Sequence, residues 1–384
     1  MTDTLRVTYR LAVDPRAAES RAEEIAREQT VEVPLAALRD DALRERIVGS
    51  VEAIDEEGRG ARVTIAYPIE TTAHDPAQLL NVVFGMTSLQ PDAECVAIDP
   101  PASLCRALGG PRFGIEGLRK ATCVEKRALT CTAVKPMGLS PDGLAGRLRI
   151  FARAGLDVVK DDQGLADHAF CPFEARVRAC LEAVEEATQE TGRRTLYAPN
   201  LIGSPDTLMR QLRLAEDLGA HAVMASPMLV GLPAFAELCR RSSVPVLAHP
   251  SFGGALRFAP EALFGTLFRL FGADAVIFVG YAGRYGTPRA ACRSLVDRLR
   301  EPLHGLQPSL PVPGGGIALA EIPEIVSFYG RDSMLLIGGG LLTAPDDAEL
   351  AARCREFARG VADASKEADA SRPTRSEAKP SEGR

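Results

Sequence analysis

Side chains with chemical uses stand at the ends of several short apolar runs. Lys135 lies at the end of the first run, and a Lys-Asp-Asp sequence at 160–162 ends the second. Asn200 and His249 lie at the ends of later runs, and Arg284 follows another. Charged groups directly after an apolar run are costly to desolvate unless they pair or bind a cation. The sequence at 160–162 therefore indicates either a divalent metal site or a Lys160–Asp salt bridge at the rim of the fold.

Two triple-glycine runs, at 314–316 and 338–340, also end apolar runs. Glycine lets backbone N–H groups come close to an anion, and such loops commonly bind phosphate. Glycines also permit tight turns, which is the alternative interpretation. Two such runs at equivalent positions favour a phosphate cradle, so we expect a small phosphorylated substrate.

The elements that carry these groups follow a regular alternation from residue 129 onward. Amphipathic stretches such as 141–155 and 204–219 separate the apolar runs, and the second has Ser204 as its expected N-cap. The eight apolar runs are Leu129–Pro136, Asp157–Asp162, Thr195–Leu201, Ala222–Pro227, Val244–Pro250, Ala275–Gly280, Leu310–Gly316 and Met334–Gly340. Eight strand–helix units predict an α/β fold of the (β/α)8 (TIM) barrel type, whose reactive groups gather where the strands end.

The first 125 residues differ from the barrel region. The stretches at 5–13 and 61–68 alternate apolar and polar residues as half-buried strands do, and 16–29 and 75–86 have helical patterns. We therefore predict an α+β domain over 1–125 and the barrel over 126–363. Residues 364–384 are polar and nearly free of large apolar side chains, so we expect a disordered tail.

Composition excludes several classes of protein. The 384 residues are 46% hydrophobic and carry a net charge of −6 with interspersed signs, which argues against a nucleic-acid surface. No segment has the length and apolarity of an export signal or a membrane span. The nine cysteines show neither CxxC pairs nor zinc spacing, which is typical of free thiols in the cytoplasm.

In this order, several motifs resemble the RuBisCO large-chain superfamily, and within it the RuBisCO-like proteins. They are EQTVEV (28–33), NVVFG (81–85), KPMGLS (135–140), GLDVVKDD (155–162), AHP (248–250), PVPGGGI (311–317) and LLIGGG (335–340). The resemblance implies a ferredoxin-like α+β N-terminal domain followed by the barrel.

The resemblance also implies roles for catalytic and metal-binding residues. Lys160 matches the lysine that forms a carbamate with carbon dioxide and then binds Mg²⁺, and Asp162 matches a carboxylate ligand. Gln163 stands where the family has a glutamate ligand, so the metal should be held more weakly. Lys135 matches a proton-transferring lysine, and His249 matches a histidine that hydrogen-bonds the substrate.

Further matches concern the substrate's phosphate and the assembly. Gly316, Gly338 and Gly339 match the family's first phosphate site. Glu28 and Asn81 match residues that complete the active site of the partner subunit, which implies a homodimer with shared active sites.

Departures from the family pattern argue against carboxylation of ribulose bisphosphate. Met137 replaces a second lysine, while Pro250 and Ile277 replace the arginine and histidine that hold a second phosphate. A bisphosphate would therefore leave one dianion unpaired. Arg284, in AGRYGT, is only an approximate substitute for the lysine that grips the carboxyl group.

Three functions remain open. The first is Mg²⁺-dependent enolate chemistry, by decarboxylation or by enolisation and isomerisation, on a monophosphorylated keto acid or ketose. The second is a non-catalytic binder or sensor of phosphorylated metabolites. The third is the methionine-salvage 2,3-diketo-phosphate enolase activity found among RuBisCO-like proteins.

Overall fold

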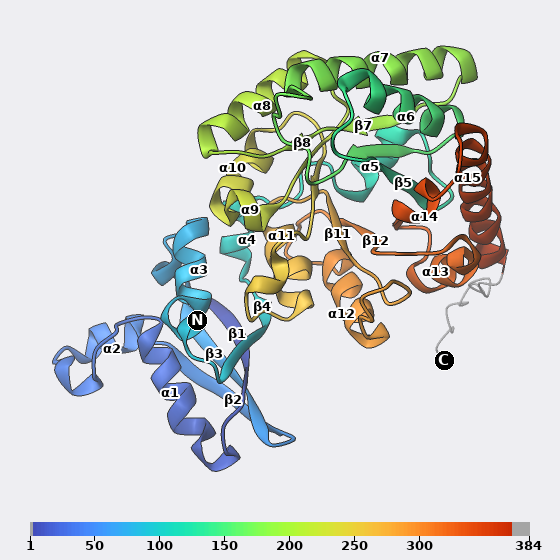
Figure 1. The fold of residues 1–384 in the computed structure, drawn as a ribbon. Coiled ribbons are helices and arrows are strands. Elements are labelled where there is room, and N and C mark those ends of the chain that lie inside the picture. The colour runs from blue at the N-terminus through green and yellow to red at the C-terminus, as the bar shows by residue number, and fades with distance from the viewer. Residues whose placement is uncertain (1–2, 371–384) are drawn as a thin grey trace, which may run out of the picture.

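The computed structural model describes residues 3–370 and has two parts (Figure 1). The N-terminal part is built on a four-stranded antiparallel sheet in the order β2-β3-β1-β4. Its strands are β1 (Thr4–Leu11), β2 (Ser50–Glu57), β3 (Gly60–Pro68) and β4 (Ala93–Asp99). Among these residues, no helix is long and apolar enough to cross a membrane.

Helices cover the buried side of this sheet. β1 buries its apolar side chains beside α1 (Ala18–Glu28) and α3 (Pro76–Phe84), and the shorter α2 (Asp41–Ile47) precedes β2. The order β-α-β-β-α-β is that of a ferredoxin-like domain. The predicted α+β fold of this part is confirmed.

The connection to the barrel contains α4 (Ala102–Leu108) and α5 (Gly114–Thr122). Ile115 and Leu118 of α5 pack against the apolar side chains inside the barrel. Asp274 accepts hydrogen bonds from the backbone N–H groups of Phe113 and Gly114, at 2.7 and 2.8 Å. These contacts fix α5 at the end of the barrel where the strands begin.

Each of the eight predicted apolar runs contains a parallel strand. The third run holds two short strands on either side of Pro199, a residue that cannot donate a backbone hydrogen bond. The strands are β5 (Leu129–Val134), β6 (Val158–Asp161), β7 (Leu196–Ala198) with β8 (Asn200–Leu201), β9 (Val223–Ala225), β10 (Val246–Ala248), β11 (Ala275–Val279), β12 (Leu310–Gly314) and β13 (Met334–Leu336). Their pairings, with β12 beside β13, form the predicted (β/α)8 barrel.

Helices surround the strands (Figure 1). They are α6 (Pro141–Arg153), α7 (Phe173–Thr191), α8 (Pro205–Asp217), α9 (Pro227–Val230), α10 (Leu232–Arg241), α11 (Phe268–Leu270), α12 (Arg289–Arg300), α13 (Ile322–Tyr329), α14 (Gly339–Leu342) and α15 (Asp347–Ala370). A π-helical segment, Glu261–Leu267, precedes α11. Ser204 caps α8 as predicted, accepting a hydrogen bond from the backbone N–H of Thr207.

The predicted start of the disordered tail, at residue 364, is wrong because the last helix continues beyond it. α15 continues to Ala370, and Ser365 is buried. Its hydroxyl donates to the carbonyl of Val361 and accepts from the backbone N–H of Ala128. Residues 364–370 are therefore helical, and the small side chains of Ala364 and Ser365 are buried in this helix. The rest of the predicted tail, 371–384, lies outside the described residues.

Candidate active site

A cavity of about 840 Å³ opens where the barrel strands end. Each site residue predicted within the barrel lines it: Lys135, Lys160, Asp162, Gln163, His249, Arg284, Gly316, Gly338 and Gly339. They come from the ends of six different strand–helix connections, since the carboxyl ends of parallel strands meet at one face of the barrel. The structure thus gathers groups that are up to 204 residues apart in the chain.

Lys160 lies at the base of this cavity. The residue is 2% exposed, and its Nζ donates a hydrogen bond to the carbonyl of Asp161 at 3.0 Å. Burial lowers the pKa of Lys160, and the positive charge of Lys135 lowers it further. A lowered pKa favours the neutral amine, which is the nucleophilic form of a lysine.

The salt bridge at the rim joins Lys135 and Asp162. The Nζ of Lys135 lies 2.7 Å from Oδ1 of Asp162. The alternative prediction of a Lys160–Asp salt bridge is therefore wrong, because no ion pair involves Lys160 within residues 3–370. The lysine that pairs with Asp162 is Lys135. Lys160 points into the barrel and is left without a counter-charge in direct contact.

Asp161 has a structural position that the sequence did not reveal. Its carboxylate accepts hydrogen bonds from Nε of Arg176 at 2.9 Å, the hydroxyl of Tyr197 at 2.7 Å and the backbone N–H of Asn200 at 3.0 Å. Both side chains of the Asp161–Arg176 pair are fully buried. Because side chains alternate along β6, this anchor points away from the cavity while Lys160 points into it.

Asn200 positions the loop that follows β6. Its side-chain amide donates to the carbonyl of Gln163 at 3.2 Å and to the carbonyl of Leu165 at 3.0 Å. Asn200 is 1% exposed, so this loop is held from beneath by a buried side chain. Gln163 is thereby fixed beside Asp162, and its own side chain lines the cavity.

His249 is held as a neutral hydrogen-bond donor. Its Nδ1 accepts a hydrogen bond from the backbone N–H of Ser251 at 3.2 Å, so the proton of the neutral ring belongs on Nε2. The Ser251 hydroxyl lies 2.9 Å from the same Nδ1. Burial, followed by the charges of Lys160 and Lys135, lowers the pKa of His249 to about 2. The imidazole therefore stays uncharged at neutral pH.

The glycine runs leave backbone donors accessible at one end of the cavity. Gly316 has φ +111°, and a side chain there would approach the backbone nitrogen of Arg284 to 3.2 Å. Gly338 and Gly339 have open space where a side chain would lie. Among the described residues, the N–H groups of Gly316 and Gly338 donate to no backbone carbonyl. Such free donors suit a phosphate.

A carboxylate placed in this cradle should exclude a phosphate. We expect Gly339→Asp to weaken binding of a phosphorylated substrate by about 100-fold, whereas Gly339→Asn, of equal size, should weaken it much less. Because the site has open space, both variants should keep the melting temperature of the unmodified protein. Isothermal titration calorimetry measures the difference, and equal losses in the two variants would refute an electrostatic role for the cradle.

Apolar side chains that lie on or beside the segments of β10, β11 and α12 also contribute to the cavity lining. They belong to Pro250, Phe252, Phe264, Ile277 and Leu295. Phe252 is 65% exposed in this lining. Pro250 and Ile277 place no positive charge at the two positions that match the family's second phosphate site.

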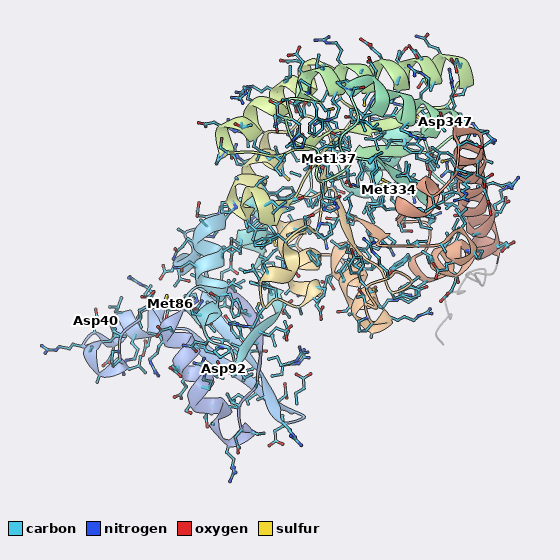
Figure 2. All side chains as sticks on the ribbon, in the orientation of Figure 1. Asp40, Met86, Asp92, Met137, Met334 and Asp347 are labelled. Atoms are coloured by element: carbon cyan, nitrogen blue, oxygen red, sulfur yellow. The ribbon has the colours of Figure 1, made fainter. Side chains whose placement is uncertain are left out.

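Two residues near the mouth depart from the RuBisCO pattern. Arg284 donates to the hydroxyl of Tyr285 at 2.9 Å, and its guanidinium lies 4.9 Å from the centre of that ring. Met137, which is labelled in Figure 2, is 55% exposed. Its sulfur lies close to Gly164 in the loop after β6. The site of the missing lysine is thus occupied by a flexible apolar side chain.

Glu28 and Asn81 lie together in the N-terminal part and away from the cavity of their own chain. Gln29, next to Glu28, donates from its side chain to the carbonyl of Asn81 at 2.8 Å. Neither Glu28 nor Asn81 lines the cavity. If they act on a substrate, the site must be that of another copy of the chain.

Comparisons with known proteins agree with this architecture. Residues 114–381 match the family described as "Ribulose bisphosphate carboxylase large chain, catalytic domain". A Rhodospirillum rubrum protein named 5-methylthioribulose-1-phosphate isomerase is 46% identical over 90% of this chain and 93% of its own length. A Geobacillus kaustophilus 2,3-diketo-5-methylthiopentyl-1-phosphate enolase is 33% identical over 82% of this chain and 81% of its own.

A solved structure extends the likeness to three dimensions. The RuBisCO-like protein from Rhodopseudomonas palustris superposes with a TM-score of 0.88 at 41% identity, covering 94% of this chain and 99% of that one. The family match and these relatives each span most of the chain. This protein therefore belongs to the RuBisCO large-chain family, as one of its RuBisCO-like proteins.

Proposed function

We propose that this protein is an enzyme that enolises and isomerises a sugar monophosphate whose far end is apolar, of the 5-methylthioribulose 1-phosphate type. The observation that carries the proposal is the mixed lining of the cavity, which combines free glycine N–H groups after β12 and β13 with apolar side chains around β10 and β11. The name of the 46% identical relative supports the choice of substrate.

Charge pairing supports one phosphate and argues against two. A phosphate dianion taken from water needs several donors or cations around it. The basic residues lining the cavity within 3–370 are Lys135, Lys160 and Arg284, plus the neutral His249. Pro250 and Ile277, which stand at the positions of the family's second phosphate site, add no positive charge to this set. Ribulose 1,5-bisphosphate should therefore bind weakly.

The residues at the base of the cavity suit a hard divalent cation only after Lys160 is modified. Asp162 offers one carboxylate and Gln163 a neutral oxygen, and no cluster of three or more His, Cys, Asp or Glu stands ready for a metal within the described residues. A carbamate on Lys160 would add the missing anionic donor. Mg²⁺ held there would polarise the substrate carbonyl and stabilise negative charge on its oxygen.

Lys135 is the proposed proton carrier. In the ion pair its ammonium contacts Asp162, so binding of Asp162 to a cation would release this lysine toward the substrate. The lysine would then take a proton from the hydroxyl-bearing carbon beside the carbonyl and return it to the carbonyl carbon, while the proton of that hydroxyl passes to the carbonyl oxygen. The neutral His249 would donate a hydrogen bond to a substrate oxygen.

Two other enzymatic functions use the same groups. The 2,3-diketo-phosphate enolase activity is supported by the name of the Geobacillus relative, at a lower identity than the isomerase. Decarboxylation of a phosphorylated keto acid would require Arg284 to hold a carboxylate, although it already donates to Tyr285. A non-catalytic phosphate sensor would bind without turnover or metal dependence.

The glutamine in the metal shell leads to a specific expectation. Gln163→Glu restores a full negative charge, so we expect Mg²⁺ to bind about tenfold more tightly. Titration of Mg²⁺ in bicarbonate buffer, followed by calorimetry, gives the affinity. Gln189→Glu on α7, in an exposed position, is the control for net charge. An equal change in both variants would remove Gln163 from the proposed metal shell.

The proposed homodimer has active sites shared between the N-terminal part of one chain and the barrel of the other. Asn81→Ala and Lys160→Ala proteins should each be inactive, and their mixture should regain activity in hybrid dimers that hold one intact site. Random exchange should restore up to about a quarter of the unmodified activity, since half of the dimers are hybrids and each has one intact site. If subunit exchange is verified by mass spectrometry and no activity returns, each site is built within one chain.

The test of the proposed function is a screen of phosphorylated ketoses and keto acids in Mg²⁺ and bicarbonate. The proposal expects an isomeric sugar phosphate from 5-methylthioribulose 1-phosphate, without release of carbon dioxide. Release of carbon dioxide from a keto acid, with no isomerisation, would support the decarboxylase instead. Tight binding without any product would support the sensor.

A further inference from the structure

The opposite face of the barrel, where the strands begin, has a second pocket, of about 610 Å³. Five arginines line it: Arg127 before β5, Arg193 and Arg194 after α7, and Arg355 and Arg359 on α15. The one acidic residue in its wall is Asp157. This concentration of positive charge stands out in a chain whose net charge is −6.

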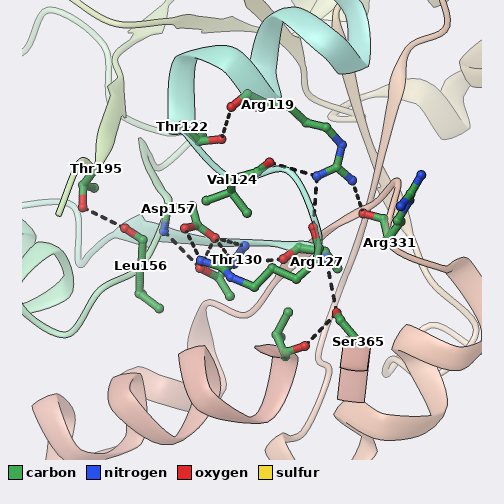
Figure 3. A network of polar contacts seen from close by, with 12 residues as sticks. Arg119, Thr122, Val124, Arg127, Thr130, Leu156, Asp157, Thr195, Arg331 and Ser365 are labelled. Atoms are coloured by element: carbon green, nitrogen blue, oxygen red, sulfur yellow. Dashed lines mark hydrogen bonds and ion pairs between the residues drawn. The ribbon is translucent and has the colours of Figure 1, made fainter. Parts of the chain in front are cut away.

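Both carboxylate oxygens of Asp157 already accept hydrogen bonds. Asp157 is 4% exposed, and its carboxylate accepts hydrogen bonds from both terminal nitrogens of Arg127 at 2.7 Å (Figure 3). It also accepts hydrogen bonds from the backbone N–H and the hydroxyl of Thr130. Arg127 and Asp157 therefore form a structural pair between the first two barrel strands. They contribute no net charge to the pocket.

The other four arginines have no ion-pair partner within residues 3–370. Other arginines of α6, α7 and α15, by contrast, pair with a glutamate or aspartate. Arg355 and Arg359 lie four residues apart on α15, a spacing at which like charges repel each other along a helix. Arg193 and Arg194 follow the last turn of α7, where a positive charge stabilises the helix. Helix stability can therefore account for these two unpaired arginines, but not for Arg355 and Arg359.

Local geometry directs Arg193 into the pocket wall. A Cβ at Gly155 would come within 2.6 Å of Nη1 of Arg193, so the guanidinium lies against this glycine of the pocket wall. Gly155 also has φ +86°, a conformation that other residues rarely adopt. The side chain of Arg193, which follows α7, therefore packs against the segment that follows α6.

We propose that this pocket binds an oligophosphate, either free or as the phosphate chain of a nucleotide. Four unpaired guanidinium groups match the three to four negative charges of such an anion, and arginine recognises phosphate oxygens through paired N–H donors. The pocket volume is within the usual range for small ligands. The chain's own residues 371–384 do not complement it, since they include four Lys or Arg and two Glu.

Calorimetric titration with tripolyphosphate tests the proposal in the Gly339→Asp protein, whose active-site cradle is blocked. We expect saturable binding of one ligand per chain that falls about tenfold or more in Arg355→Gln/Arg359→Gln. The matched control is Arg210→Gln/Arg213→Gln on α8, which removes the same charge from another helix. Absence of saturable binding, or equal weakening by the two double variants, would overturn the proposal.

Cys123 provides a site-specific readout. It is exposed, whereas the other eight cysteines are buried, and it lines the same pocket. Tripolyphosphate should slow its alkylation by iodoacetamide at concentrations that saturate the calorimetric signal. An unchanged alkylation rate at saturation would place the ligand elsewhere and overturn the assignment. Equal affinities for tripolyphosphate and ATP would identify the phosphate chain as the ligand, and tighter ATP binding would identify a nucleotide; both support the proposed chemistry.

Discussion

Replacement of Lys160 by alanine is expected to lower turnover of the substrate by at least about 10³-fold and to abolish specific Mg²⁺ binding. The reason is that Asp162 and Gln163 alone provide a single negative charge at the base of the cavity, and only a modified Lys160 can add a second. Steady-state kinetics in Mg²⁺ and bicarbonate measure the first effect, and calorimetry measures the second.

A matched variant separates chemistry from packing. Lys160→Met keeps most of the side-chain volume but cannot form a carbamate, so it should lose the same activity while keeping a normal melting temperature. Lys126→Met, in an exposed position before β5, should leave both properties unchanged. Activity retained in Lys160→Met, or activity insensitive to EDTA, would be incompatible with the proposed metal-assisted mechanism.

Loss of the buried Asp161 carboxylate is expected to lower the free energy of unfolding by about 3–5 kcal/mol. Asp161→Ala leaves the fully buried guanidinium of Arg176 without its counter-charge, and also removes acceptors for Tyr197 and Asn200. Urea unfolding followed by circular dichroism gives the change. Because this anchor fixes the end of β6, activity should fall as well.

An exposed ion pair provides the comparison. Glu186→Ala removes the partner of Arg149 between α6 and α7, where both side chains are partly exposed, and should cost no more than about 1 kcal/mol. Similar losses for Asp161→Ala and Glu186→Ala would mean that the buried pair is not an anchor of the strand end.

The barrel was predictable because its signal is repeated. Eight apolar runs, each followed by an amphipathic stretch, leave few alternatives to a closed parallel sheet, and strand ends then meet at one face. The glycine runs and Lys160 lie in the same cavity for that reason. In the N-terminal part the sequence patterns located β1, β3, α1 and α3, but β2 and β4 became evident only from their pairing with the other strands.

Contacts between side chains that are distant in the sequence could not be predicted from it. Asp161 and Asp162 are adjacent in the sequence, but Asp161 is a structural anchor and Asp162 lines the cavity. Their different roles depend on the alternation of side chains along β6 and on the pairing of Asp161 with Arg176, fifteen residues later. The partner of Asp162 is Lys135 because the ends of β5 and β6 are neighbours in the sheet. Residues 364–370 were misjudged because composition does not reveal that Ser365 packs against Ala128.

Deuterium exchange tests the central claim most directly. The protein is incubated in D2O with Mg²⁺ and bicarbonate, first with 5-methylthioribulose 1-phosphate and then with ribulose 1,5-bisphosphate, and proton NMR follows the C–H signals beside the carbonyl. Our account predicts exchange and isomerisation of the monophosphate, both lost in Lys160→Met, and no detectable change in the bisphosphate. Equal or faster exchange into the bisphosphate, or exchange into the monophosphate that persists in Lys160→Met, would contradict it.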